Sequence, residues 1–159
     1  MGAEDITPTS FLFPKYFINH AERRESQQYP NNQNISVKME PELIFFNSRE
    51  QLLRLDTKRI VYFEADGNLT YIVLANKLKA TVSMNLSKME EFLALQYKDK
   101  ARVFMRIGKR FIINMNYIYS IQVAKQKLIL SDYSNFTFQL PVSKEALRKM
   151  KELLLIKKV

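Results

Sequence analysis

The stretch from 101 to 122 constrains the fold most, because two apolar runs flank a short charged break. Within 102–107, Val, Met and Ile alternate with Arg, Phe and Arg. This period of two predicts a strand that is half buried against a core. Gly-Lys-Arg at 108–110 interrupts the apolar pattern, which resumes with Phe-Ile-Ile at 111–113. We therefore expect a hairpin with a glycine in its turn and two cations at its tip.

Strand signals also dominate the rest of the chain from Leu43 onward. The Asp66-Gly67-Asn68 sequence is a strong hairpin signal, because glycine readily adopts positive φ. Short connections between apolar runs favour antiparallel pairing. Further strands are expected at 43–47, 52–55, 59–65, 69–75, 78–83, 118–123, 127–130 and 136–140.

Two segments change to helical spacing. Apolar residues recur at helical intervals in 86–93, and either Asn85 or Ser87 can cap that helix. The second helix follows Ser143, a favourable N-cap, and Glu145 suits its positive first turn. These strand and helix patterns predict a mainly antiparallel β fold class, with one short internal helix and a C-terminal helix.

The N-terminal part of the chain differs in composition. Residues 11–18 are aromatic and apolar, whereas 27–34 are rich in Gln, Asn and Pro and are typical of a linker. We divide the chain into an aromatic segment with its linker, 1–41, and a domain, 42–159. The aromatic cluster is expected to pack on that domain or on a second copy of the chain, which makes a homodimer possible.

The positive charge is concentrated in the domain. The whole chain carries +9. Residues 1–42 contain 4 Lys/Arg and 6 Asp/Glu, or −2, and residues 43–159 contain the remaining 21 and 10, or +11. A basic domain favours polyanions, because each neutralised phosphate releases counterions. A generally basic protein without a nucleic-acid partner is the alternative reading of the charge alone.

The sequence offers little for catalysis or for a cofactor. The chain has no cysteine, which excludes a disulfide framework, a Cys-based zinc site and a thiol nucleophile. His20 is the only histidine and has no evident partner, and no metal-ligand spacing or phosphate-binding glycine loop is present. We expect no enzyme, catalytic residue, metal or cofactor. No apolar run is long enough for a membrane helix, so we expect a cytoplasmic protein without a membrane partner.

Three segments resemble a known family in order and spacing. They are the Arg-Ile-x-x-x-Phe-Ile-Ile-Asn pattern at 106–114 with its continuation at 117–121, the run at 59–68, and Leu-Pro-Val-Ser-Lys at 140–144. Together they resemble the signature of LytTR-type DNA-binding domains of bacterial transcription regulators, over about 43–154. The resemblance implies small stacked antiparallel sheets that read double-stranded DNA with loops at one edge, rather than with a recognition helix.

Three cationic residues near the central turn are candidate DNA contacts. Arg110 can bind guanine O6 and N7 with two hydrogen bonds, and either Lys109 or Arg110 can hold a phosphate. Their alternative role is that of a solvated β-turn. Arg106 alternates with core positions, so it either points outward near the same edge or pairs with a carboxylate.

Three further candidates follow from the resemblance. Asn68 and Thr70 lie just after the Asp-Gly turn, where family members contact DNA, although Asn68 can also simply serve the turn. Lys144 follows Ser143 at a helix start, where the family commonly places a cation that touches DNA. A lysine there opposes the helix dipole, and this mild cost adds weight to a functional role.

Two other functions remain open. The chain has Gly-Lys-Arg at 108–110 where the family usually carries His-Arg-Ser or similar, which motivates an interaction module that has lost specific DNA reading and binds a protein through its aromatic N-terminus. A binder of single strands or RNA is the third hypothesis, because strand tyrosines can stack on bases. Tyrosine is also an ordinary strand residue, which is the favoured reading for Tyr62, Tyr71, Tyr117 and Tyr119.

Overall fold

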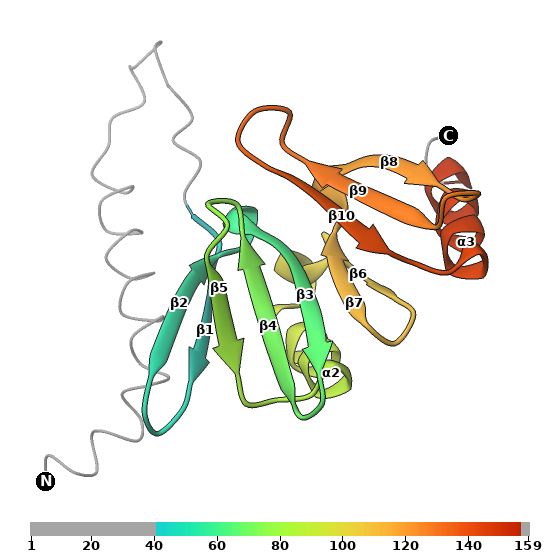
Figure 1. The fold of residues 1–159 in the computed structure, drawn as a ribbon. Helices are drawn as coiled ribbons and strands as arrows, with labels where there is room; N and C mark the ends of the chain where they lie inside the picture. Colours follow the sequence, from blue (N-terminus) through green and yellow to red (C-terminus); the bar gives the residue numbers. More distant parts are fainter. Residues whose placement is uncertain (1–40, 157–159) are drawn as a thin grey trace, which may run out of the picture. The chain divides into compact units, whose positions relative to one another are not determined.

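A computed structural model describes residues 41–156, and the elements within that range are mostly strands (Figure 1). Two α-helices interrupt them, α2 at Leu86–Tyr97 and α3 at Lys144–Ile156. The strands are β1 (Leu43–Asn47), β2 (Leu52–Asp56), β3 (Ile60–Asp66), β4 (Leu69–Leu74), β5 (Lys79–Val82), β6 (Phe104–Ile107), β7 (Phe111–Asn114), β8 (Ile118–Gln122), β9 (Lys127–Ser131) and β10 (Thr137–Pro141).

The largest sheet has five strands in the order β5-β4-β3-β7-β6, and all of its pairings are antiparallel. β3 is central, because it pairs with β4 on one side and with β7 on the other. Glu64, near the end of β3, lies opposite Tyr71 of β4 and Phe111 of β7. The β3–β4 turn and the β6–β7 turn therefore lie at the same edge of this sheet, toward the bottom of Figure 1.

Two smaller sheets complete the strands. β8, β9 and β10 form an antiparallel sheet in the order β10-β9-β8, and β1 pairs with β2. β10 is an edge strand, and its last residue, Pro141, lies opposite Lys127. A proline is tolerated there because an edge strand has backbone groups that need no partner in the sheet. The strand predicted at 136–140 is present as β10, shifted by one residue at each end.

One face of the five-stranded sheet packs against α2 and β1. Buried residues of β3, β4 and β7 meet Ile44 and Phe46 of β1 and the apolar side of α2. Aromatic rings contribute to this packing, since Phe46 of β1 and Phe92 of α2 meet edge to face at 5.3 Å between ring centroids. The hydroxyl of Tyr97, in the last turn of α2, accepts a hydrogen bond of 2.8 Å from the backbone N–H of Phe45.

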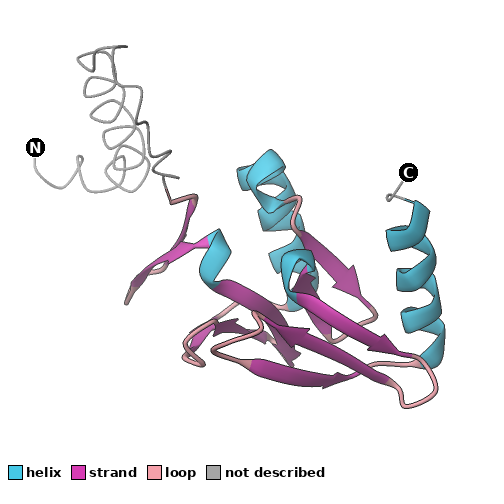
Figure 2. Cartoon of the chain, turned by 90° about the horizontal axis from the view of Figure 1, so that it is seen from above, coloured by secondary structure: helices cyan, strands magenta, loops and turns pink. Residues whose placement is uncertain are grey.

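The other face packs against the three-stranded sheet and α3. Its core cluster joins Ile107 and Phe111, which flank the β6–β7 turn, to Leu128 and Leu130 of β9 and to Leu147 of α3. Figure 2 shows α2 and α3 apart, with strands between them. The sheet that carries the two turns is therefore covered on both faces, while the turn residues 66–68 and 108–110 are exposed.

Both predicted helices are present. Asn85 caps α2, because its side-chain oxygen accepts a 2.8 Å hydrogen bond from the N–H of Lys88, and Ser87 lies inside the helix. The helix runs beyond the predicted 86–93. Ser143 caps α3 through a 3.2 Å hydrogen bond from the N–H of Ala146. The predicted fold class is confirmed by these helices and by the antiparallel sheets.

The strand expected at 102–107 differs from its prediction. It begins at Phe104, because the preceding residues form a 3-10 helix, Lys98–Ala101, and a turn. Both of its faces contact core clusters, with Met105 and Ile107 on one side and Phe104 on the other. The ring of Phe104 meets Phe63 edge to face at 5.2 Å. The expectation of a strand buried on one face was wrong, because the sheet is covered on both.

The N-terminal predictions lie outside the described residues. Of the segment predicted at 1–41, only Pro41 is described, so its aromatic cluster and the possible homodimer contact remain predictions. Neither α2 nor α3 has the length and apolar content that a membrane-spanning helix needs.

Candidate nucleic-acid interface

The two turns at the lower edge of the five-stranded sheet are held side by side by the backbone. The N–H of Ala65, near the end of β3, donates a hydrogen bond of 2.8 Å to the carbonyl of Arg110 in the β6–β7 turn. Glycine sets the backbone conformation in both turns, with φ of +59° at Gly67 and +58° at Gly108. A Cβ on either glycine would meet open space, so positive φ is what requires glycine here.

Arg106 supports the β6–β7 turn on the side that faces α2. Its Nε donates to the carbonyl of Gly108 at 2.9 Å, and its Nη2 donates to the carbonyl of Lys109 at 3.2 Å. Its Nη1 lies 3.1 Å from a carboxylate oxygen of Glu90 on α2. Of the two roles open for Arg106, the structure shows pairing with a carboxylate. The side chain is only 20% exposed.

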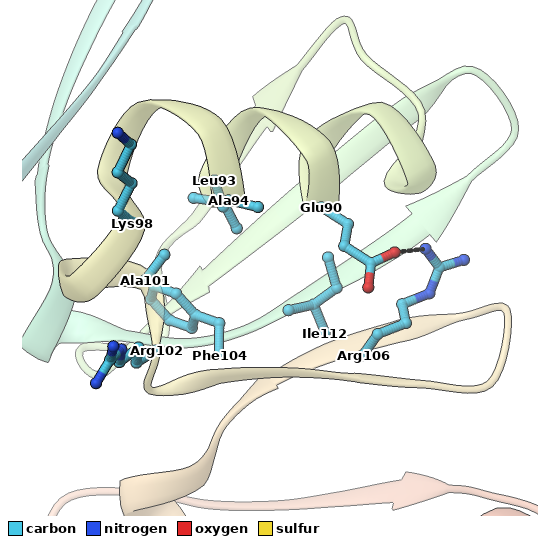
Figure 3. A pocket seen from close by; sticks show the side chains of 9 residues that line it. All are labelled: Glu90, Leu93, Ala94, Lys98, Ala101, Arg102, Phe104, Arg106 and Ile112. Atoms are coloured by element: carbon cyan, nitrogen blue, oxygen red, sulfur yellow. Dashed lines mark hydrogen bonds and ion pairs between the residues drawn. The ribbon is translucent and has the colours of Figure 1, made fainter.

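A small crevice lies beside this ion pair, between α2 and β6 (Figure 3). Its volume is about 100 Å³. The Glu90–Arg106 pair closes one end, while Leu93, Phe104 and Ile112 form part of its apolar lining. The pair is therefore part of the packing between α2 and the hairpin, and it fixes the turn relative to the helix.

Arg110 is held on the side of the same turn that faces β3. Its Nη2 lies 2.8 Å from a carboxylate oxygen of Glu64 on β3, and its guanidinium carbon lies 5.1 Å from the centroid of the Phe111 ring. The Arg110 side chain is 58% exposed, whereas that of Glu64 is 18% exposed. The guanidinium thus remains accessible while the carboxylate that holds it is largely covered.

Lys109 and Asn68 are the exposed polar tips of the two turns. Within residues 41–156, neither side chain makes a hydrogen bond or an ion pair. Free cationic and amide groups at adjacent turns are suited to phosphates and base edges. Lys109 and Asn68, together with Arg110, are therefore the predicted residues that the structure brings together at one accessible edge.

Thr70 does not belong to this edge. Its side chain is fully buried, and its hydroxyl donates a 2.7 Å hydrogen bond to the carbonyl of Met84. The resemblance placed it at a DNA contact, but β4 turns this position toward the core, where a base cannot reach it. We correct the sequence-based assignment and exclude Thr70 from the candidate interface.

The neighbouring Tyr71 is partly exposed, whereas Thr70 is buried. Its hydroxyl donates a 2.6 Å hydrogen bond to a carboxylate oxygen of Asp66, and this hydrogen bond raises the pKa of Tyr71. The ammonium of Lys79 lies 4.7 Å from the Tyr71 ring centroid. Sequence reasoning treated Tyr71 as an ordinary strand residue. The alternation along β4 was the available signal, since residues on either side of a buried threonine face the opposite way.

The other tyrosines considered for base stacking have different surroundings. Tyr62 is 8% exposed and packs edge to face against Phe111 and Phe138. Tyr117 packs edge to face on Phe136, and its hydroxyl donates to the carbonyl of Lys58. Tyr119 is 56% exposed and lies on the three-stranded sheet. Stacking of bases along a row of strand tyrosines therefore has no support in this arrangement.

Lys144 is exposed at the first residue of α3. In the described part of the chain, no hydrogen bond or ion pair connects it to either turn. α3 itself is anchored by Leu147 and Met150, which share a core cluster with Ile107 and Phe111 beside the β6–β7 turn. The helix that carries Lys144 is thus packed on the same hairpin that presents Lys109 and Arg110.

Two comparisons found known proteins or families to which this chain is similar. A solved structure of the LytTr DNA-binding domain of a protein described as a methyl-accepting/DNA response regulator from Bacillus cereus is similar, with 22% sequence identity and a TM-score of 0.49. The alignment covers 72% of this chain and 98% of that chain. A search of curated proteins found no match. The family profile of the LytTr DNA-binding domain matches residues 50–155, which is more than half of the chain. The chain therefore belongs to the family of LytTr DNA-binding domains.

Proposed function

We propose that this chain is a bacterial, cytoplasmic transcription regulator that binds double-stranded DNA with sequence specificity. The observation that carries the proposal is the pair of adjacent turns at one sheet edge, in a member of a DNA-binding family. The net charge of +11 over residues 43–159 supports it, because a polyanion is the natural partner of such a domain. The proposed activity is binding, without chemical conversion of a substrate.

The residues at the edge supply three kinds of contact. Arg110 keeps N–H groups beyond the one that faces Glu64, so it can donate two hydrogen bonds to guanine O6 and N7. Asn68 can donate to and accept from an adenine edge. Lys109 and Lys144 are assigned to phosphates, which orient the domain without reading sequence.

Turns rather than helices would enter the DNA. The major groove is about 12 Å wide and admits a two-stranded β-ribbon. The β3–β4 and β6–β7 hairpins share β3 and β7 as neighbours and end at one edge, so they form a rigid four-stranded support for two tips. We propose that these tips read bases in the major groove.

Selection of bound fragments from a pool of random duplexes tests the proposal. The full chain should enrich one sequence pattern, and binding to it should weaken steeply as salt rises. Unpaired DNA and RNA of the same length serve as competitors. Preferential binding to either competitor would support the single-strand hypothesis instead. Failure to bind any duplex at low salt would favour a protein-interaction module and reject the proposed function.

A homodimer through residues 1–41 is a second, separate proposal. Its motivation is the aromatic composition of 11–18, which is large enough for its burial to contribute several kcal/mol, at about 1.5–3 kcal/mol per side chain. Light scattering of the full chain and of a chain without residues 1–34 measures the mass per particle. The same number of chains per particle in both proteins would reject the dimer through this segment. Loss of folding in the shortened chain would assign the segment to the core.

A further inference from the structure

The β6–β7 turn is held by two ion pairs with opposite exposure. On the α2 side, the arginine is the covered partner, since Arg106 is 20% exposed and Glu90 is 52% exposed. On the β3 side, the carboxylate is the covered partner, since Glu64 is 18% exposed and Arg110 is 58% exposed. The first pair therefore fixes the turn itself, while the second holds an accessible guanidinium in front of it.

Arg110 is restrained at three points. Its carbonyl accepts the hydrogen bond from Ala65, its guanidinium lies over the Phe111 ring, and its Nη2 contacts Glu64. An unrestrained arginine side chain loses rotamer entropy on binding. Here part of that loss has already occurred in the free protein, so the guanidinium presents its remaining N–H groups in a fixed direction.

We propose that Glu64 is a specificity-determining residue, which acts by holding Arg110 in the orientation that reads a base and by opposing its use as a general phosphate contact. This inference rests on the proposed function. Glu64 itself touches the protein and reads no base, so it is a positioning residue for Arg110.

The physical reason is the difference in charge between a phosphate and a base edge. A phosphate that approaches Arg110 meets the Glu64 carboxylate 2.8 Å from the same guanidinium, so the two anions compete and repel each other. Guanine O6 and N7 are neutral acceptors and need only the outward N–H groups. The ion pair therefore weakens binding to arbitrary DNA more than binding to a site with guanine in register.

Replacement of Glu64 by glutamine tests the inference, because it removes the charge and keeps the shape. We expect Glu64→Gln to bind unrelated duplex more tightly, so that the ratio of specific to non-specific affinity falls about tenfold. This change lies within the range by which one contact of two hydrogen bonds to a base discriminates the right base from a wrong one. The slope of log affinity against log salt concentration for non-specific binding should steepen by about one unit, as expected for one additional phosphate contact. Glu64→Asp retains the charge and should keep an intermediate ratio. A merely structural role would weaken both kinds of binding together.

A double-mutant cycle separates the ion pair from a general effect of charge. In an Arg110→Gln background, Glu64→Gln should leave the ratio unchanged, because the residue that it positions is absent. Glu91→Gln is the matched control, since it removes one exposed carboxylate from α2 that makes no hydrogen bond or ion pair within residues 41–156. We expect Glu91→Gln to leave the ratio near that of the wild type.

The outcomes distinguish the two proposals. Binding of a selected duplex by the wild-type chain, with an unchanged ratio in Glu64→Gln, would overturn the role of Glu64 and leave the DNA-binding function intact. A fall in the ratio that persists in the Arg110→Gln background would also overturn it, because the charge would then act without Arg110. Absence of duplex binding by the wild-type chain would reject both proposals.

Discussion

The side-chain amide of Asn114 donates a 2.9 Å hydrogen bond to the carbonyl of Ile60 and so connects the end of β7 to the start of β3. The same amide reaches the carbonyl of Thr57 at 3.4 Å, and its oxygen accepts a 3.0 Å hydrogen bond from the N–H of Asn116. Asn114 is 1% exposed. It therefore satisfies backbone groups at the end of the sheet opposite the two turns.

Asn114→Ala should lower the free energy of unfolding by about 2–3 kcal/mol, because buried carbonyls lose their donor. Urea unfolding followed by circular dichroism measures the change. Asn116→Ala is the control, since that side chain is exposed and the expected change is within about 0.5 kcal/mol. Equal stability of the two variants would show that the buried amide contributes nothing.

Lys109→Ala should weaken binding to all duplexes alike and reduce the salt slope by about one unit. Stability should stay within about 0.5 kcal/mol of the wild type, because the side chain is exposed and has no partner in residues 41–156. Fluorescence anisotropy at several salt concentrations measures both quantities. Lys100→Ala removes the same charge from the 3-10 helix at the other end of β6 and should leave the slope unchanged. A wild-type slope in Lys109→Ala would remove this residue from the interface.

Arg106→Lys should weaken binding to the selected site several-fold without changing the salt slope. Lysine keeps the charge, but its ammonium cannot reproduce the separate hydrogen bonds to Gly108, Lys109 and Glu90, so the turn loses its support. Loss of these bonds should also lower stability by about 1 kcal/mol. A slope that falls by about one unit would instead mean that Arg106 contacts a phosphate.

Thr70→Val should destabilise the domain by about 1 kcal/mol and leave base preference unchanged. Valine fills the same space but leaves the carbonyl of Met84 without its 2.7 Å hydrogen bond. Thermal unfolding and repeated selection from the random duplex pool measure the two effects. An altered selected sequence at unchanged stability would return Thr70 to the interface.

Asp132→Asn should reduce the acid sensitivity of folding. Partial desolvation raises the pKa of Asp132, but hydrogen bonds from the backbone N–H groups of Ser134, Phe136 and Asn135 and from the Asn135 amide outweigh it and hold the pKa well below 3.8. The folded pKa lies below the unfolded value, so the carboxylate stabilises the fold fully above about pH 5 and loses this effect progressively as pH falls through the unfolded pKa towards the folded pKa.

The stability difference between wild type and Asp132→Asn should therefore narrow as pH falls from about 5. Urea unfolding at a series of pH values measures it. A difference that is constant over the same range would mean that the carboxylate has its ordinary pKa in the folded chain.

Local sequence signals were enough for the turns and the helix starts. Gly67 and Gly108 have the positive φ that the turn patterns required, and Asn85 and Ser143 cap the two helices. Each of these features depends on a few neighbouring residues, so a single sequence contains the necessary information. The strands of the five-stranded sheet were predicted for the same reason, apart from shifts of one or two residues at most ends.

The partners of the two arginines were not predictable in this way. Glu90 lies 16 residues from Arg106, and Glu64 lies 46 residues from Arg110, so only the folded sheet brings them together. Thr70 was misassigned for a related reason. Alternation along β4 separates its two faces, but it does not reveal that both faces of the sheet are covered and that a polar residue on one of them is buried.

The central position of β3 couples the two turns mechanically. β3 is hydrogen-bonded to β4 and β7, the strands that follow the two turns, so neither tip can move along the sheet without it. An insertion or deletion in β3 would displace both tips relative to the rest of the sheet, whereas exchanges within a turn would alter one tip alone. Single substitutions in a turn can therefore change the base preference of such a domain. The distance between the two turns, in contrast, depends on the length of β3 and stays constant as long as that length does.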